Sequence, residues 1–227
     1  KPGFNPAGMG IGGAPVEGPG YGALTAQYYL EMARAFETSG AGNINIFQEI
    51  PNYASDLLNY LVHSTSPTPY EGSYATYNFG DAENGQKQGF SEWYALCAFH
   101  LSEHFGESDN GRYIRRWFDR TQPPTPPYVS FHSFYFMYRM PNWSTADYGN
   151  SLDPDYLARG MGVLFSRSGW QDDATWFGFQ SGSRWNNHQH ADVHNFAIFR
   201  KGQWLSQEDH GYDSTVFGTH DVHSTLT

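Results

Sequence analysis

Apolar residues in the first 145 residues of the chain recur every three or four positions, which is the spacing of an amphipathic helix. The pattern predicts helices over residues 22–38, 53–63, 91–105 and 111–120. The expected buried stripe of the first helix consists of Leu24, Tyr28, Met32, Ala35 and Phe36. Ser91 is the expected N-cap of the third helix, and Gly106 is its expected end.

The pattern changes further along the chain. Residues 122–128 include four prolines, which end a helix because proline lacks a backbone N–H, and a short last helix is expected at 131–140. From Leu152 onward, short runs rich in aromatic and β-branched residues are separated by turn residues. They predict strands over 161–166, 174–180, 195–200 and 203–206, with another beginning at Val222. Lys201-Gly202 is the expected turn of a hairpin.

Helices followed by antiparallel strands indicate an α+β chain of two units in series, and they argue against alternating βαβ units. We place the helical unit at residues 1–145 and the strand-rich unit at 146–227. So few helices make only part of a helical barrel, and so few strands cannot close a sandwich. We therefore expect a fragment of a larger fold.

The composition is polar but poor in charge. Hydrophobic residues make up 39% of the chain, aromatic residues 18% and charged residues only 16%. Sugars present apolar C–H faces that stack on aromatic rings and hydroxyl groups that suit neutral polar side chains. The composition is therefore typical of secreted carbohydrate-active proteins, and we expect a secreted or periplasmic location. The alternative is that the rings only fill a core.

Charge and cysteine content exclude several classes. A net charge of −10 argues against binding to nucleic acid or to an anionic membrane surface. No apolar run is long enough to span a membrane. The one cysteine, Cys97, cannot form an internal disulfide, and its apolar neighbours predict a buried, inert thiol.

The segment 185–212 carries the strongest functional signal. His188, His190, Asp192 and His194 occupy alternate positions just before the apolar run 196–199. Alternate residues of an extended strand project to one face. Polar side chains beside a core are costly unless they are paired or bind a ligand, so the row predicts a site. The alternative is a set of solvated histidines at the end of a strand.

Several ordered segments of the chain resemble the heparinase II/III-like superfamily of polysaccharide lyases, which includes alginate and oligo-alginate lyases. The similar segments are residues 17–21, 78–81, 162–170, 188–192, 209–212 and 223–226. The resemblance implies an (α/α) toroid followed by an antiparallel β-sandwich, both partial here, with a cleft between them. It also implies cleavage of a uronic-acid-containing glycan by β-elimination. A similar Glu-Gly-x-Tyr pattern occurs at 71–74, but a predicted helix follows only the first copy directly.

The resemblance implies that Tyr21 and His188 are the catalytic acid–base pair. Tyrosine has a pKa of about 10 and needs a nearby cation or donor to act as a base near neutral pH. Tyr21 begins a predicted helix, whose dipole favours the phenolate. The alternative is a tyrosine that packs against Leu24 or Tyr28. The family's carboxylate-neutralising Asn-His segment would precede residue 1 of this chain.

Further roles follow from residue type and from position beside the histidine row, and the resemblance implies that the metal is structural. The expected substrate-binding residues are Glu17, Arg184, Trp185 and Asn187, with Arg167 as a less favoured arginine. The expected ligands of a structural Zn²⁺ are His190, Asp209 and His223. Asp209 could instead be a turn residue, and His210 and His220 are substitutes for His223.

Two other functions stay open. An (α/α)-barrel glycoside hydrolase would need two carboxylic acids across a cleft, for which Glu17, Glu71, Asp81 and Glu92 are available. A non-catalytic glycan-binding protein could keep the same fold. The expected partner in each case is a polysaccharide or oligosaccharide, acidic for a lyase, and self-association is possible. Only 13 lysines and arginines are present, which favours a polyuronate without sulfate.

Overall fold

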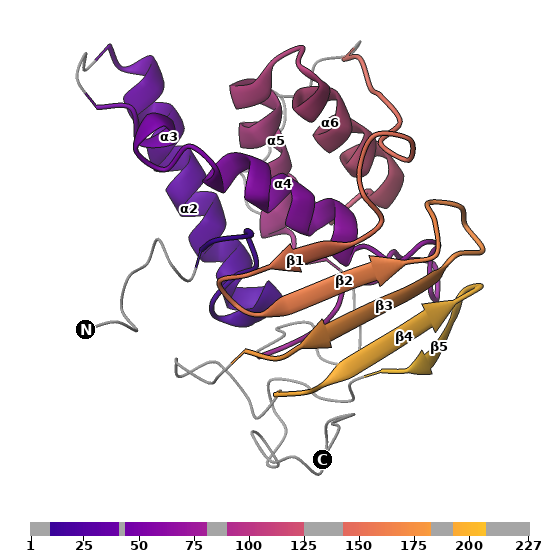
Figure 1. Cartoon of the computed structure of the whole chain (residues 1–227). Coiled ribbons are helices and arrows are strands. Elements are labelled where there is room, and N and C mark those ends of the chain that lie inside the picture. Colours follow the sequence, from indigo (N-terminus) through magenta and orange to yellow (C-terminus); the bar gives the residue numbers. More distant parts are fainter. Residues whose placement is uncertain (1–9, 41–43, 81–89, 125–142, 183–192, 208–227) are drawn as a thin grey trace.

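The computed structural model describes residues 10–40, 44–80, 90–124, 143–182 and 193–207. In this part of the chain, helices come first and one antiparallel sheet follows (Figure 1). The helices are α2 (Gly18–Thr38), α3 (Ile46–Glu49), α4 (Tyr53–Ser64), α5 (Trp93–Phe105) and α6 (Asp109–Thr121). The strands are β1 (Tyr156–Ala158), β2 (Val163–Arg167), β3 (Thr175–Gln180), β4 (Phe196–Arg200) and β5 (Gln203–Ser206). The expected order of helices before antiparallel strands is confirmed.

The boundaries of the helices follow local chemistry. Helix α2 begins one turn earlier than expected, because Pro19 suits the first turn of a helix, where its missing N–H is not needed. The predicted N-cap of α5 is wrong by one residue: Glu92 holds that position, and Ser91 Oγ accepts a 3.4 Å hydrogen bond from Trp93 N. Gly106 ends α5 with a φ of 54°, as expected.

The buried face of α2 differs from the predicted one. Tyr28 and Met32 are 59% and 46% exposed, whereas Ala26, Leu30 and Ala33 are buried. Small side chains let α2 pack closely against α5, where Cys97 Sγ lies 3.9 Å from the carbonyl oxygen of Ala23. The predicted burial of Cys97 is confirmed, and burial raises the pKa of its thiol far above the ordinary value.

The five strands form an antiparallel meander in the order β1-β2-β3-β4-β5. Lys201 and Gly202 join β4 to β5 with φ values of 50° and 76°, which confirms the predicted hairpin turn. The three-residue strand β1 was not predicted, because it is too short to show a pattern. The helix expected at 131–140 and the strand expected from Val222 lie outside the described residues.

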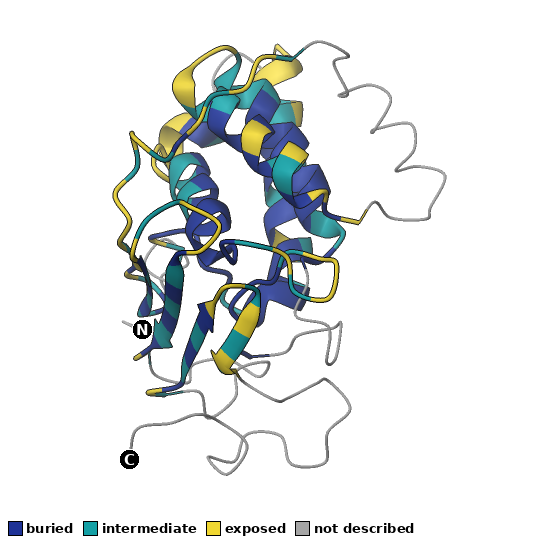
Figure 2. Cartoon of the chain, turned by 90° about the vertical axis from the view of Figure 1, so that its right-hand side faces the viewer, coloured by how far each residue is buried: buried dark blue, intermediate teal, exposed yellow. Residues whose placement is uncertain are grey.

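The core lies between the helices and one face of the sheet (Figure 2). Val163, Phe165, Trp176 and Phe199 are fully buried on that face. Tyr60 of α4 meets the ring of Phe165 edge-on, with centroids 5.8 Å apart. One hydrophobic cluster therefore contains residues of both parts of the chain. The division at residues 145 and 146 stays a prediction, as do closure of a toroid and of a sandwich.

Candidate active site

Tyr21 and Glu17 lie at the start of α2. Glu17 is the N-cap of the helix, and its side chain makes no capping hydrogen bond. Tyr21 follows in the first turn and is half-buried. Tyr21 is therefore in the first turn of a helix, at the positive end of the helix dipole, as expected.

The turn between β1 and β2 brings two distant segments of the chain together. Gly160 N donates a 2.7 Å hydrogen bond to the carbonyl of Ile11, a few residues before α2. Ser181 N donates a 2.8 Å hydrogen bond to the carbonyl of Gly162, just after β3. The first turn of α2 lies at this end of the sheet (Figure 1). The segment that precedes Tyr21 and the segment that leads toward His188 are thus anchored on one turn.

Two glycines permit this close approach. A Cβ atom on Gly12 would lie 2.4 Å from Ala158 Cα, and one on Gly182 would lie 2.0 Å from the carbonyl oxygen of Met161. Both distances are well below van der Waals contact, and the atoms approached belong to the backbone, which cannot move aside. The junction therefore depends on residues without a side chain.

Most of the predicted site residues lie outside the described part of the chain. They are Arg184, Trp185, Asn187, His188, His190, Asp209 and His223. Within the described ranges, no group of three His, Cys, Asp or Glu side chains could hold a metal ion. The pairing of Tyr21 with His188 and the proposed zinc ligands consequently stay predictions.

His194 is the one described member of the histidine row, and it does not lie in an extended strand. Its φ is 66°, its side chain is exposed, and its backbone N–H donates a 2.7 Å hydrogen bond to Gln180 O. Strand β4 begins only at Phe196. The predicted alternation along one strand is therefore wrong at His194, because a left-handed residue turns the chain there.

The second Glu-Gly-x-Tyr segment forms a hairpin instead of a helix start. Tyr70 and Ser73 exchange backbone hydrogen bonds of 2.8 and 3.1 Å, and Glu71 and Gly72 between them have φ values of 49° and 87°. Glu71 is exposed at the tip. This geometry favours the first copy, with Tyr21, as the one similar to the lyase pattern.

Arg167, the less favoured candidate for binding a substrate carboxylate, has a structural role. Its guanidinium is buried and donates hydrogen bonds of 3.0 and 2.9 Å to the carbonyls of His63 and Thr65 at the end of α4. The guanidinium carbon also lies 4.2 Å from the centre of the Trp170 ring. Burial lowers the Arg167 pKa to about 10. Arg167 Nη2 donates to the terminal carbonyls of a helix and the side chain is buried, so the described structure gives Arg167 a structural role and not a place on an exposed binding surface.

Comparison with known proteins supports the fold. No protein-family model matches the sequence, and no curated protein matches it. The structure is similar to the heparan sulfate lyase HepC from Pedobacter heparinus, with 14% identity and a TM-score of 0.51 over 88% of this chain and 26% of that chain. It is also similar to a heparinase III, with 17% identity and a TM-score of 0.53 over 90% of this chain and 26% of that chain.

At such low identity, the likeness establishes a shared fold. The chain spans about a quarter of the length of these lyases, 26% in each case. The described helices and sheet therefore have the arrangement of one part of that lyase fold, which agrees with the expectation of a fragment. None of the helices in the described ranges is long and apolar enough to cross a membrane.

Proposed function

We propose that the chain is part of a polysaccharide lyase that cleaves a uronic-acid-containing glycan by β-elimination. One observation carries the proposal: the described part of the chain is similar in fold to part of a heparan sulfate lyase. In addition, Tyr21 lies in the first turn of α2, at the same end of the sheet at which β3 leads toward the histidine row. Tyr21 and His188 are the proposed acid–base pair. A secreted or periplasmic location belongs to the same proposal.

The chemistry makes defined demands on these two residues. A base removes the proton from C5 of the uronate, and that electron pair forms the C4–C5 double bond. The bond from C4 to the glycosidic oxygen breaks, and an acid protonates the departing oxygen. A phenol and an imidazole on the two sides of the C4–C5 bond can perform both transfers, and the helix dipole at Tyr21 favours the phenolate that the first transfer requires.

Substrate binding is assigned to side chains close in sequence to this pair. Arg184 would bind the uronate carboxylate through two parallel hydrogen bonds, which suit a planar guanidinium. Trp185 would stack on a sugar face, and Asn187 and Glu17 would bind hydroxyl groups. The substrate is thus a uronate polymer, either without sulfate, as in alginate, or of the heparan sulfate type named for the similar structures.

A structural Zn²⁺ held by His190, Asp209 and His223 is also part of the proposal. Two imidazoles and a carboxylate are a donor set that suits Zn²⁺, so the chemistry of the three side chains fits the ion. When bound, the ion would cross-link segments distant in sequence and restrain the segment that carries His188. No proton transfer in the proposed reaction depends on it.

The test is an assay on alginate and on heparan sulfate that follows the ultraviolet absorbance of the unsaturated uronate product. Tyr21→Phe removes only the hydroxyl and should lower the rate by about 10²–10⁴-fold, the usual contribution of a general acid or base. Tyr28→Phe, on the exposed side of the same helix, is the matched control and should leave the rate unchanged.

Each contrary outcome identifies an alternative. Near-full activity in Tyr21→Phe would transfer the role to Tyr74 or Tyr212. New reducing ends without the absorbance would indicate a hydrolase, and binding without cleavage would indicate a glycan-binding protein.

A further inference from the structure

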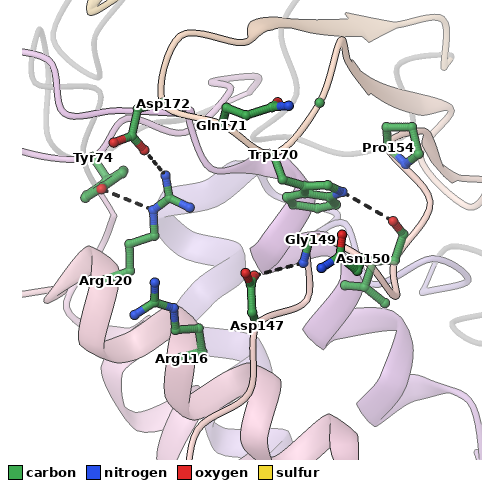
Figure 3. Close-up of a pocket in the computed structure, with 12 residues that line it drawn as sticks. Tyr74, Arg116, Arg120, Asp147, Gly149, Asn150, Pro154, Trp170, Gln171 and Asp172 are labelled. Carbon is green, nitrogen blue, oxygen red and sulfur yellow. Dashed lines mark hydrogen bonds and ion pairs between the residues drawn. The ribbon is translucent and has the colours of Figure 1, made fainter.

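An open pocket of about 710 Å³ lies beside the turn between β2 and β3 (Figure 3). The first turn of α2, which contains Tyr21, lies at the other end of β2 (Figure 1). Its walls come from α6, from Tyr74 after the exposed hairpin, from the segment 147–154 and from the turn between β2 and β3. The volume is within the range of pockets that bind small organic ligands, roughly 300–1,000 Å³. No site residue of the proposed reaction lines it.

One arginine of the pocket is fixed by the protein. Arg120 Nε donates a 3.1 Å hydrogen bond to the Tyr74 hydroxyl, and Arg120 Nη2 lies 2.8 Å from Asp172 Oδ1 (Figure 3). Arg120 Nη2 also donates to the carbonyl of Pro67. Asp172 therefore balances the charge of Arg120, whose guanidinium forms a rigid part of the wall.

A second arginine is not engaged in this way. Arg116 lies one turn before Arg120 on α6, is exposed, and lines the same pocket. It forms no salt bridge or hydrogen bond with any residue that the structure describes. Asp147, which also lines the pocket, accepts a 2.9 Å hydrogen bond from Gly149 N. Arg116 is thus a guanidinium available to an anionic group of a ligand.

The remaining walls suit a sugar. The half-buried ring of Trp170 is held in place, because its Nε1 donates a 3.2 Å hydrogen bond to Leu152 O and Arg167 stacks on it. Exposed side chains of Asn150 and Gln171 add planar amides at the rim. An aromatic ring with planar polar side chains around it can bind the apolar face and the hydroxyl groups of a pyranose.

We propose that this pocket is a second glycan-binding site that holds one uronate residue, with Arg116 on the sugar carboxylate. Because Asp172 pairs with Arg120, the pocket offers the ligand one guanidinium, that of Arg116, which matches a single carboxylate better than a phosphate dianion. The choice of a uronate rests on the proposed function. The site itself is independent of Tyr21, which lies at the opposite end of the sheet, so the pocket can hold a distant part of a long chain.

The experiment measures calorimetric binding of a short oligouronate to the whole chain in the Tyr21→Phe background, where cleavage is expected to be about 10²–10⁴-fold slower. Arg116→Gln should weaken binding about tenfold or more, since it removes a charge-assisted pair. Arg200→Gln removes the same charge from an exposed site at the end of β4 and should leave binding unchanged. A neutral oligosaccharide of equal length should bind more weakly than the oligouronate.

Hydrogen exchange then locates the ligand. Peptides that cover residues 147–154 and 169–172 should gain protection with the oligouronate, and Arg116→Gln should reduce the gain at the same oligouronate concentration. The proposal is overturned if these peptides do not respond, if both arginine variants weaken binding equally, or if inorganic sulfate competes as well as the oligouronate. If the unchanged protein shows no lyase activity in any assay but Arg116-dependent protection is observed, the proposed function is refuted and the second site is still supported.

Discussion

At the residue scale, burial shifts the pKa of side chains for which the sequence alone predicts no shift. His100 of α5 is 3% exposed, and its pKa is lowered to about 4 by burial and, secondly, by the nearby charge of Arg34. The side chain is therefore neutral in the folded protein over the whole range in which a free histidine takes up a proton.

This depressed pKa predicts acid destabilisation. Below a pH of about 6.5 the unfolded chain binds a proton at His100 that the folded chain does not, so the free energy of unfolding falls as the pH falls toward about 4. The loss attributable to this residue is up to about 3 kcal/mol. Urea unfolding measures the free energy of unfolding at neutral pH and near pH 4. The decrease between the two pH values should be smaller for His100→Gln than for the unchanged protein.

The control for this measurement is His194→Gln, at an exposed position before β4. This variant should keep the full difference between the two pH values. Equal differences for all three proteins would show that His100 does not contribute.

At the element scale, the packing of α2 depends on the size of its side chains. Ala26 is 3% exposed in the face that meets α5, whereas the adjacent Thr25 is exposed. Small residues at a helix contact bring the two axes close together, which leaves no room for a larger group.

Enlarging this contact should therefore destabilise the fold. Ala26→Leu should lower the free energy of unfolding by about 1–3 kcal/mol, the usual effect of overpacking a core. Thr25→Leu adds a similar side chain on the outer face and should change stability by less than about 0.5 kcal/mol. Thermal unfolding of the two variants tests the assignment, and similar melting temperatures would contradict the observed orientation of α2.

At the scale of the whole molecule, the proposed zinc ion should contribute to stability more than to the reaction. Metal analysis should find one zinc per chain, and a strong chelator should lower the melting temperature by about 2–4 °C for each kcal/mol of binding free energy lost. His190→Ala should remove the metal and this response to chelator, and should lower stability more than the activity of each folded molecule. His194→Ala should retain both, and a metal-free protein with normal stability would refute the site.

The sequence by itself determined the elements whose causes are local. The prolines after residue 122 end a helix because they lack a backbone N–H. Gly106 and Gly202 turn the chain because glycine adopts positive φ values without a steric penalty. The change from helical to alternating patterning also predicted the order of helices and strands. Tyr21 was expected at the start of a helix, and it lies in the first turn of α2, which begins at Gly18.

Only the tertiary structure decided which surfaces meet. The apolar stripe of α2 with Tyr28 and Met32 is exposed, because the close contact with α5 selects the small-residue face instead. Arg167 is a helix-capping residue because the carbonyls it binds lie more than 100 positions earlier in the chain. The pocket around Arg116 is built from four separate segments of the chain, and no local sequence pattern predicts it. Contacts between residues distant in sequence depend on how whole elements pack against one another. Local periodicity and residue type do not determine this packing.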